Sequence, residues 1–167
     1  MNYAHRMDEL EAIRDEDRPL VKLGADLCKE HANEGRLYLG EHPLRSAIWK
    51  EGEIEELRQL PDNWEVICDA GAYGAETEDG MPIQKPHRWI TNSQYIAKEP
   101  DKKLTPEQKQ YTAKVEVKET TRSGQYCHGL ASAILEGLQK EALHRNPQRF
   151  HQRPDSHESH KTLCQAC

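Results

Sequence analysis

The chain has 167 residues, a formal net charge of −6, 35% hydrophobic residues, 6% aromatic residues and 31% charged residues. This length holds one domain with a real core but hardly two, so part of the polar excess has to lie in tails at the chain ends. The acidic balance argues against nucleic-acid binding by the whole surface, and no stretch approaches the roughly 18 apolar residues of a membrane span.

Cysteine usage indicates the compartment. The five cysteines are odd in number, and Cys28, Cys68 and Cys127 each lie singly in apolar segments. This pattern is typical of reduced thiols rather than of a disulfide framework, and no charged-then-apolar leader opens the chain. We therefore expect an intracellular protein, in the cytoplasm or nucleus, with no membrane partner.

The first elements are helical. Residues 1–17 are a polar, acidic lead-in that we expect to be frayed or loosely helical. From Arg18 to Ala32, apolar residues recur at spacings of three and four, at Leu20, Leu23 and Leu27, and Gly35 follows the end. The pattern predicts an amphipathic helix with a glycine stop.

The later elements alternate between strands and helices. We expect strands at 36–40, 64–69 and 87–91, an acidic turn ending in Asp79-Gly80, a surface strand within 111–119, and helices at about 54–60 and 125–143. The sequence thus predicts one α/β domain over 18–143, followed by a flexible tail over 144–167.

Polar side chains stand where the predicted strands end. Glu41 and His42 follow the strand that contains Leu37 and Leu39, and Asp69 closes the strand over 64–69. Because α/β folds place their sites at the ends of strands, we expect any functional site to lie there.

These segments also carry motifs of a known family. The chain has Gly35-Arg36-Leu37-Tyr38-Leu39-Gly40-Glu41-His42-Pro43 with Ala47 and Trp49, then Val66, Asp69, Tyr73-Gly74, Lys85-Pro86, Trp89, Thr91-Asn92-Ser93, Ala133-Ile134 and Gly137-Leu138. Over residues 18–142 it resembles the C-terminal half of the methyltransferase-like domain of copia-type retrotransposon polyproteins, itself similar to cytosine-C5 DNA methyltransferases. The resemblance implies a three-layer α/β sheet with flanking helices, a partial class I methyltransferase-like (Rossmann-like) fold.

The resemblance implies a role for Glu41. It maps onto the acid of the Glu-Asn-Val motif, which hydrogen-bonds the target base, whereas His42-Pro43 depart from that motif. The two candidate catalytic residues are therefore Glu41 and His42. The other interpretation is that both side chains only satisfy backbone amides at a strand-to-loop corner. On either view, we expect Glu41→Gln to leave stability nearly unchanged.

Two parts of such an active site are absent from the sequence. A Gly-rich turn after a first strand, which lets the backbone approach S-adenosylmethionine, is not found. No cysteine follows a proline, as the nucleophile of this family does, and Cys68 precedes Asp69 instead of following it. We therefore expect no methyl transfer by this chain alone, and S-adenosylmethionine binding only with a complementing polypeptide segment.

A second candidate site lies in KPHRWITN. Lys85 and Arg88 beside Trp89 combine cations with an aromatic ring, as sites for single-stranded nucleic acid do, and Asn92 follows. The resemblance supports this interpretation, because the matching strand of DNA methyltransferases contacts the base and sugar. The alternative is that Trp89 packs inward while the cations stay solvated, and that Asn92 or Ser93 caps the next helix.

The tail offers candidate zinc ligands in His157, His160, Cys164 and Cys167. Imidazole and thiolate are the ligands of structural zinc sites. However, only three residues separate the two pairs, so a polar terminus with accidental ligands is the alternative.

Two functions follow. The first is a methyltransferase-like fragment of a mobile-element polyprotein, inactive without its cofactor-binding half. The second is a non-enzymatic α/β interaction module that contacts protein or nucleic acid, with or without a zinc-binding tail.

Overall fold

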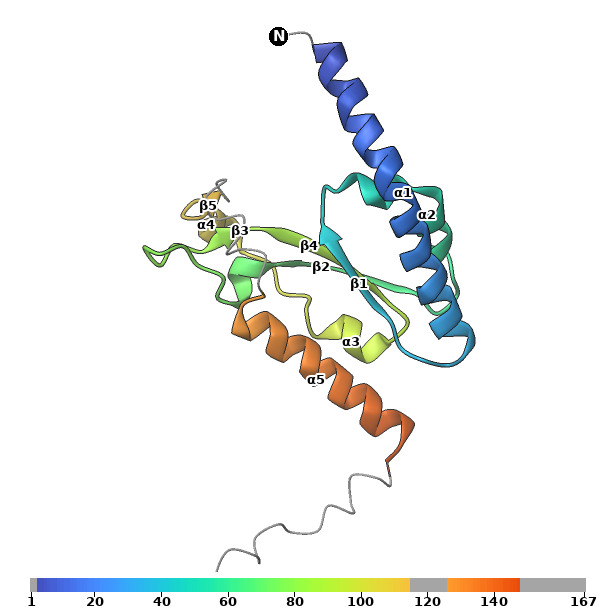
Figure 1. Cartoon of the computed structure of the whole chain (residues 1–167). Helices are drawn as coiled ribbons and strands as arrows, with labels where there is room; N and C mark the ends of the chain where they lie inside the picture. The colour runs from blue at the N-terminus through green and yellow to red at the C-terminus, as the bar shows by residue number, and fades with distance from the viewer. Residues whose placement is uncertain (1–2, 115–125, 148–167) are drawn as a thin grey trace, which may run out of the picture.

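The computed structural model describes residues 3–114 and 126–147 (Figure 1). Its elements, in chain order, are α1 (Tyr3–Asn33), β1 (Leu39–Pro43), the 3-10 helix η1 (Ala47–Lys50), α2 (Gly52–Arg58), β2 (Trp64–Asp69), the 3-10 helix η2 (Ala70–Tyr73), β3 (Ile83–Gln84), β4 (Pro86–Thr91), α3 (Gln94–Lys98), α4 (Pro106–Lys109), β5 (Ala113–Lys114) and α5 (His128–Arg145).

The sheet has three strands in the order β1-β4-β2. β2 and β4 contain the strands predicted over 64–69 and 87–91, whereas β1 begins at Leu39 instead of residue 36 and includes Glu41 and His42, which were expected to follow the strand. The central strand β4 is antiparallel to both neighbours, so β1 and β2 run parallel to each other without touching. The prediction of a mixed α/β domain is confirmed. A three-layer Rossmann-like fold is not confirmed, because the sheet is small and antiparallel. After β2 the chain passes through η2, a turn and β3 and returns as the antiparallel neighbour β4, instead of crossing over to a parallel strand.

Helices cover both faces of the sheet (Figure 1). On one face, α1, α2 and η1 build a core around the β4 residue Ile90, and its buried members are Ala25, Tyr38, Trp49, Ile54, Leu57 and Ile90. On the other face, α5 and η2 pack over Trp89, with Cys68, Tyr73 and Leu130 buried there. Successive strand residues point to opposite faces, so Trp89 and Ile90 belong to different cores.

The first helix is longer than predicted and buries a different face. The expected lead-in and the expected helix form one continuous α1 of 31 residues with Pro19 inside it. Its contacts with the core come from Val21, Ala25, Cys28 and Ala32. The predicted apolar stripe consists of Leu20, Leu23 and Leu27. These side chains are 68%, 54% and 47% exposed. The helix is confirmed, but its predicted inward face is wrong.

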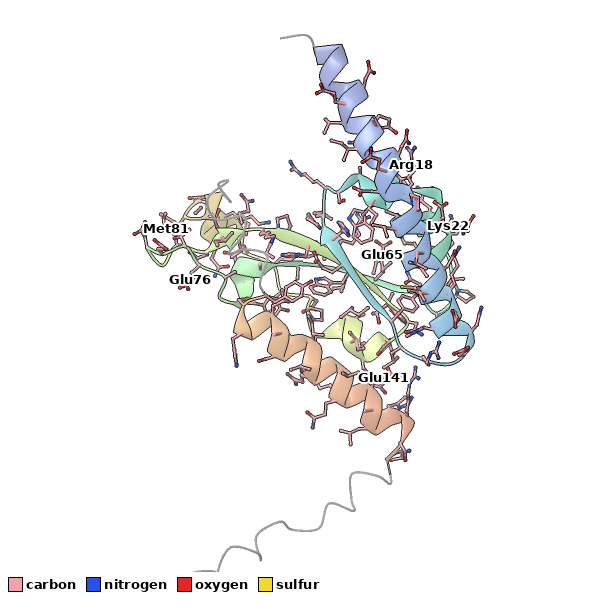
Figure 2. All side chains as sticks on the ribbon, in the orientation of Figure 1. Arg18, Lys22, Glu65, Glu76, Met81 and Glu141 are labelled. Carbon is pink, nitrogen blue, oxygen red and sulfur yellow. The ribbon has the colours of Figure 1, made fainter. Side chains whose placement is uncertain are left out.

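α5 approaches its neighbours closely at two glycines. A Cβ on Gly129 would lie 2.3 Å from the Tyr73 carbonyl oxygen, and one on Gly137 would lie 2.7 Å from the Ile96 Cα. Farther along the helix, the carboxylate of Glu141 accepts a hydrogen bond from the Ser93 hydroxyl, and Figure 2 places Glu141 on the side of α5 that faces α3. Ser93 also caps α3. It is one of the two residues predicted to cap the helix after KPHRWITN, and its hydroxyl accepts a hydrogen bond from the Ile96 amide.

The remaining predictions concern the turn, the last strand and the membrane. The acidic turn is confirmed by an antiparallel bridge between Glu76 and Pro82, with Gly80 at a φ of 77°. β5 lies within the predicted strand over 111–119, whose residues from 115 onward fall outside the described ranges, as does the tail from 148. Among the described helices, none is long and apolar enough to span a membrane.

Candidate functional site

Glu41 lies at the centre of a hydrogen-bonded group on the α5 face of the sheet. In the register it stands opposite Trp89. One carboxylate oxygen, Oε1, lies 2.5 Å from Nδ1 of His87 on β4. The other, Oε2, accepts a hydrogen bond of 2.8 Å from the hydroxyl of Tyr126, just before α5. Three segments distant in sequence therefore meet at one carboxylate.

The surroundings hold Glu41 in its ionised form. Burial by itself would raise the pKa of Glu41. The hydrogen bonds from His87 and Tyr126 and the nearby imidazole of His42 lower this pKa by more than burial raises it, so the net shift is downward. The same contact acts oppositely on the phenol, because burial and the negative charge of Glu41 both raise the pKa of Tyr126. At neutral pH the group is thus a carboxylate that accepts from a phenol.

Aromatic rings enclose this group. The imidazole of His87 is 3% exposed, and its centroid lies 6.2 Å from the Trp89 ring and 6.3 Å from the Tyr126 ring. The Trp89 indole N–H points to Cys68 Sγ at 3.2 Å. Burial raises the pKa of the Cys68 thiol to about 11, so this cysteine is a poor nucleophile near neutral pH.

His42, the second candidate catalytic residue, points to the opposite face from Glu41 because the two are adjacent in β1. Its ring packs edge-on to Trp49, with centroids 6.3 Å apart. It lines an apolar groove of about 500 Å³ between α1, β1 and η1, together with Leu20, Gly24 and Ile54. The structure therefore directs the side chains of Glu41 and His42 to opposite faces of the sheet, and they share no hydrogen-bond partner among the described residues.

The candidate nucleic-acid residues are also divided between faces. Trp89 is 2% exposed on the α5 side, whereas the Arg88 guanidinium lies over the Trp49 ring, 5.3 Å from its centroid, on the other side. The Asn92 side chain accepts from the Tyr38 amide and donates to the Arg36 carbonyl. Lys85 precedes β4, and its carbonyl accepts from the Ala70 amide. In this arrangement Trp89 offers no open ring face, and nucleic-acid binding stays a prediction.

The comparisons with known proteins add no family. No family model matches the chain, and neither a curated protein nor a solved structure matches it. The resemblance seen in the motifs therefore stands on those residues alone.

Metal binding also stays a prediction. The described residues hold no group of three or more His, Cys, Asp or Glu side chains arranged for a metal ion. The candidate zinc ligands His157, His160, Cys164 and Cys167 lie outside the described residues, so they stay a prediction.

Two members of the Glu41 group were missed from the sequence. His87 is not among the residues that carry the resemblance, and Tyr126 lies 85 residues from Glu41 along the chain. The alternation of β4 indicates that His87 and Trp89 share a face. Only the strand order shows that this face is the one Glu41 points to.

Proposed function

We propose that this chain is the methyltransferase-like part of a mobile-element polyprotein, inactive alone and completed by a polypeptide that carries the cofactor-binding half. The observation that supports it is that Glu41, the middle residue of β1, lies in the same sheet as the other two motif-bearing strands and faces His87 and Trp89 of β4. When bound by the completed domain, S-adenosylmethionine would supply the methyl group.

The geometry of Glu41 supports inactivity of the isolated chain. Both carboxylate oxygens are engaged by His87 and Tyr126, so neither is directed at a substrate. Cys68 is fully buried with a raised pKa, and it cannot replace the Pro-Cys nucleophile. For Glu41 to contact a base through Oε2, the Tyr126 hydroxyl, 2.8 Å away, has to leave it.

Calorimetry with S-adenosylmethionine tests the proposal. We expect no binding and no methyl transfer by the chain alone, and both to emerge on adding a cofactor-binding half of the same kind of polyprotein. Glu41→Gln should abolish the restored transfer, while Glu136→Gln, which changes an exposed carboxylate on α5, should not. Transfer by the chain alone, or restored transfer that survives Glu41→Gln, would overturn the proposal.

A non-enzymatic interaction module is the second candidate. It is favoured by the apolar residues that α1 leaves exposed, from Met7 through Leu27. Lys85 and Arg88 are its proposed contacts with nucleic acid, whereas Trp89 is 2% exposed and the Asn92 side chain bonds to the backbone of Arg36 and Tyr38. We place either function inside the cell, supported by the free thiols of Cys28, Cys68 and Cys127.

A further inference from the structure

α1 carries an apolar stripe that the domain does not use. Ile13, Leu20 and Leu27 recur every seven residues and are 56%, 68% and 47% exposed. Seven residues are nearly two helical turns, so the three side chains form one line along the helix. The N-terminal half of α1 also extends well beyond the sheet (Figure 1).

The apolar stripe of α1 lies on the side of the domain where β1 forms the edge of the sheet. On its other flank, α1 contacts α2 through Lys29, whose ammonium lies 2.7 Å from Glu56. Leu27 precedes Lys29 by two positions and so points about 200° around the helix from it, away from α2. Leu20 lines the groove next to the β1 residues Gly40 and His42. The stripe and β1 are therefore on the same side of the domain.

The outer edge of β1 is open. The Leu44 amide donates to the Pro86 carbonyl, so by alternation Gly40 and His42 direct their backbone groups to β4, and Leu39 and Glu41 direct theirs outward. Within the described residues, β1 pairs with no strand other than β4. No lysine lies in β1, and Pro43, which has no N–H, is its last residue, so the outward backbone groups of Leu39 and Glu41 are those open to a further strand.

We propose that this surface binds a second copy of the chain. One twofold axis perpendicular to the sheet would pair β1 with its counterpart antiparallel and set the two α1 helices side by side, also antiparallel. The strands would join into one six-stranded sheet, and the two stripes would bury each other. Pairing centred on Gly40 places Leu39 of one copy opposite Glu41 of the other, so that the two Glu41 carboxylates do not face each other.

Charge favours this antiparallel arrangement. Residues 3–18 hold six acids and three bases, a net charge of −3, whereas residues 19–33 hold two of each and are neutral apart from His31. A parallel pair would set the two acidic halves together. The antiparallel pair places each acidic half against a neutral one and sets Ile13 of one copy near Leu27 of the other, which makes the surface self-complementary.

Sedimentation equilibrium over a wide range of protein concentration tests the inference. We expect a reversible monomer–dimer equilibrium. Leu20→Glu should raise the dissociation constant by at least about a hundredfold, because the substitution enters the symmetric interface twice. Leu135→Glu is the matched control, since Leu135 is 63% exposed on α5, away from this surface, and it should leave the constant unchanged.

Hydrogen exchange locates the contact. As concentration rises, the amides of Leu39 and Glu41 should exchange more slowly, whereas those of Gly40 and His42, already bonded to β4, should not change. A chain that stays monomeric, or a dimer that Leu20→Glu weakens no more than Leu135→Glu, would overturn the inference. A monomer would leave this surface for a different polypeptide. None of these measurements involves the cofactor, so they stand apart from the proposed function.

Discussion

The carboxylate of Glu41 on β1 lies 2.5 Å from Nδ1 of His87 on β4. The contact is diagonal across the strand pair, since Glu41 stands opposite Trp89 and His87 is two residues along on the same face. An ionised carboxylate only accepts hydrogen bonds, so Nδ1 of His87 has to carry the proton. The sheet thus sets which atom of a buried imidazole faces the carboxylate.

Glu41→Gln should destabilise the chain. The glutamine amide can accept from only one of the two partners, and it replaces a charge-assisted hydrogen bond by neutral ones, which costs about 1–2 kcal/mol. This revises the expectation from sequence that stability would hardly change. Urea unfolding measures the cost, and Glu136→Gln, an exposed i,i+4 partner of Lys140, should cost less than about 0.5 kcal/mol. Equal effects would contradict the contribution of the buried contact.

Acid should remove most of this difference. The pKa of Glu41 lies below its ordinary value of 4.5 in the folded chain, so its contribution is present above pH 4.5 and is lost as pH falls through the folded pKa. Unfolding free energies of the parent chain and Glu41→Gln should therefore differ at pH 7 and converge toward pH 3. Burial raises the pKa of Glu141, but its bonds from Ser93 and Arg145 outweigh this, so the parent chain should also lose stability through Glu141. A gap between the two proteins that grows in acid would contradict this assignment.

Cys68 should resist alkylation. Its side chain is fully buried and its pKa is raised to about 11, which leaves on the order of 0.1% or less thiolate at pH 8. Mass spectrometry after brief iodoacetamide treatment should find Cys68 unmodified in the folded chain and modified in urea. Rapid modification without denaturant would mean that α5 opens from the sheet.

The sequence predicted elements better than it predicted faces. The strand over 64–69 has the predicted bounds, because Val66 and Ile67 are flanked by turn-forming residues. The inward face of α1 was mistaken because leucines dominate hydrophobicity, whereas the core side uses the smaller Val21, Ala25 and Cys28. Spacing alone cannot show which of two apolar stripes has a partner.

For the candidate site, too, the sequence indicated one residue but not its partners. Glu41 could be singled out because it follows the apolar residues Leu37 and Leu39, but its partners depend on strand order, which local patterns do not encode. The antiparallel insertion of β4 between β1 and β2 brings His87 to Glu41. The same alternation sends Arg88 and Trp89 to opposite faces, which a linear motif such as KPHRWITN conceals.

Zinc binding by the tail is a separate prediction. If His157, His160, Cys164 and Cys167 hold the metal, affinity should fall as pH drops below the imidazole range, because protons compete for the ligands. Metal analysis after purification without chelators, before and after adding zinc, checks this. Less than about a tenth of an equivalent in both cases would contradict a structural site. A chain ending at Gln148 is the control and should remain folded.

Gly137→Ala and Gly24→Ala should have opposite effects on stability. Each lies inside a helix, where alanine is favoured over glycine by up to about 1 kcal/mol. At Gly24 a Cβ meets nothing within 4 Å, so this substitution should stabilise the chain by about 0.5–1 kcal/mol. At Gly137 the added Cβ would lie 2.7 Å from the Ile96 Cα and 2.9 Å from the Tyr95 carbonyl oxygen. Because both contacts are backbone, α5 has to shift away from α3, and we expect a loss of about 1–3 kcal/mol. Thermal and urea unfolding of the two variants measures both effects, and a stabilising Gly137→Ala would mean that α5 does not pack against α3 in solution.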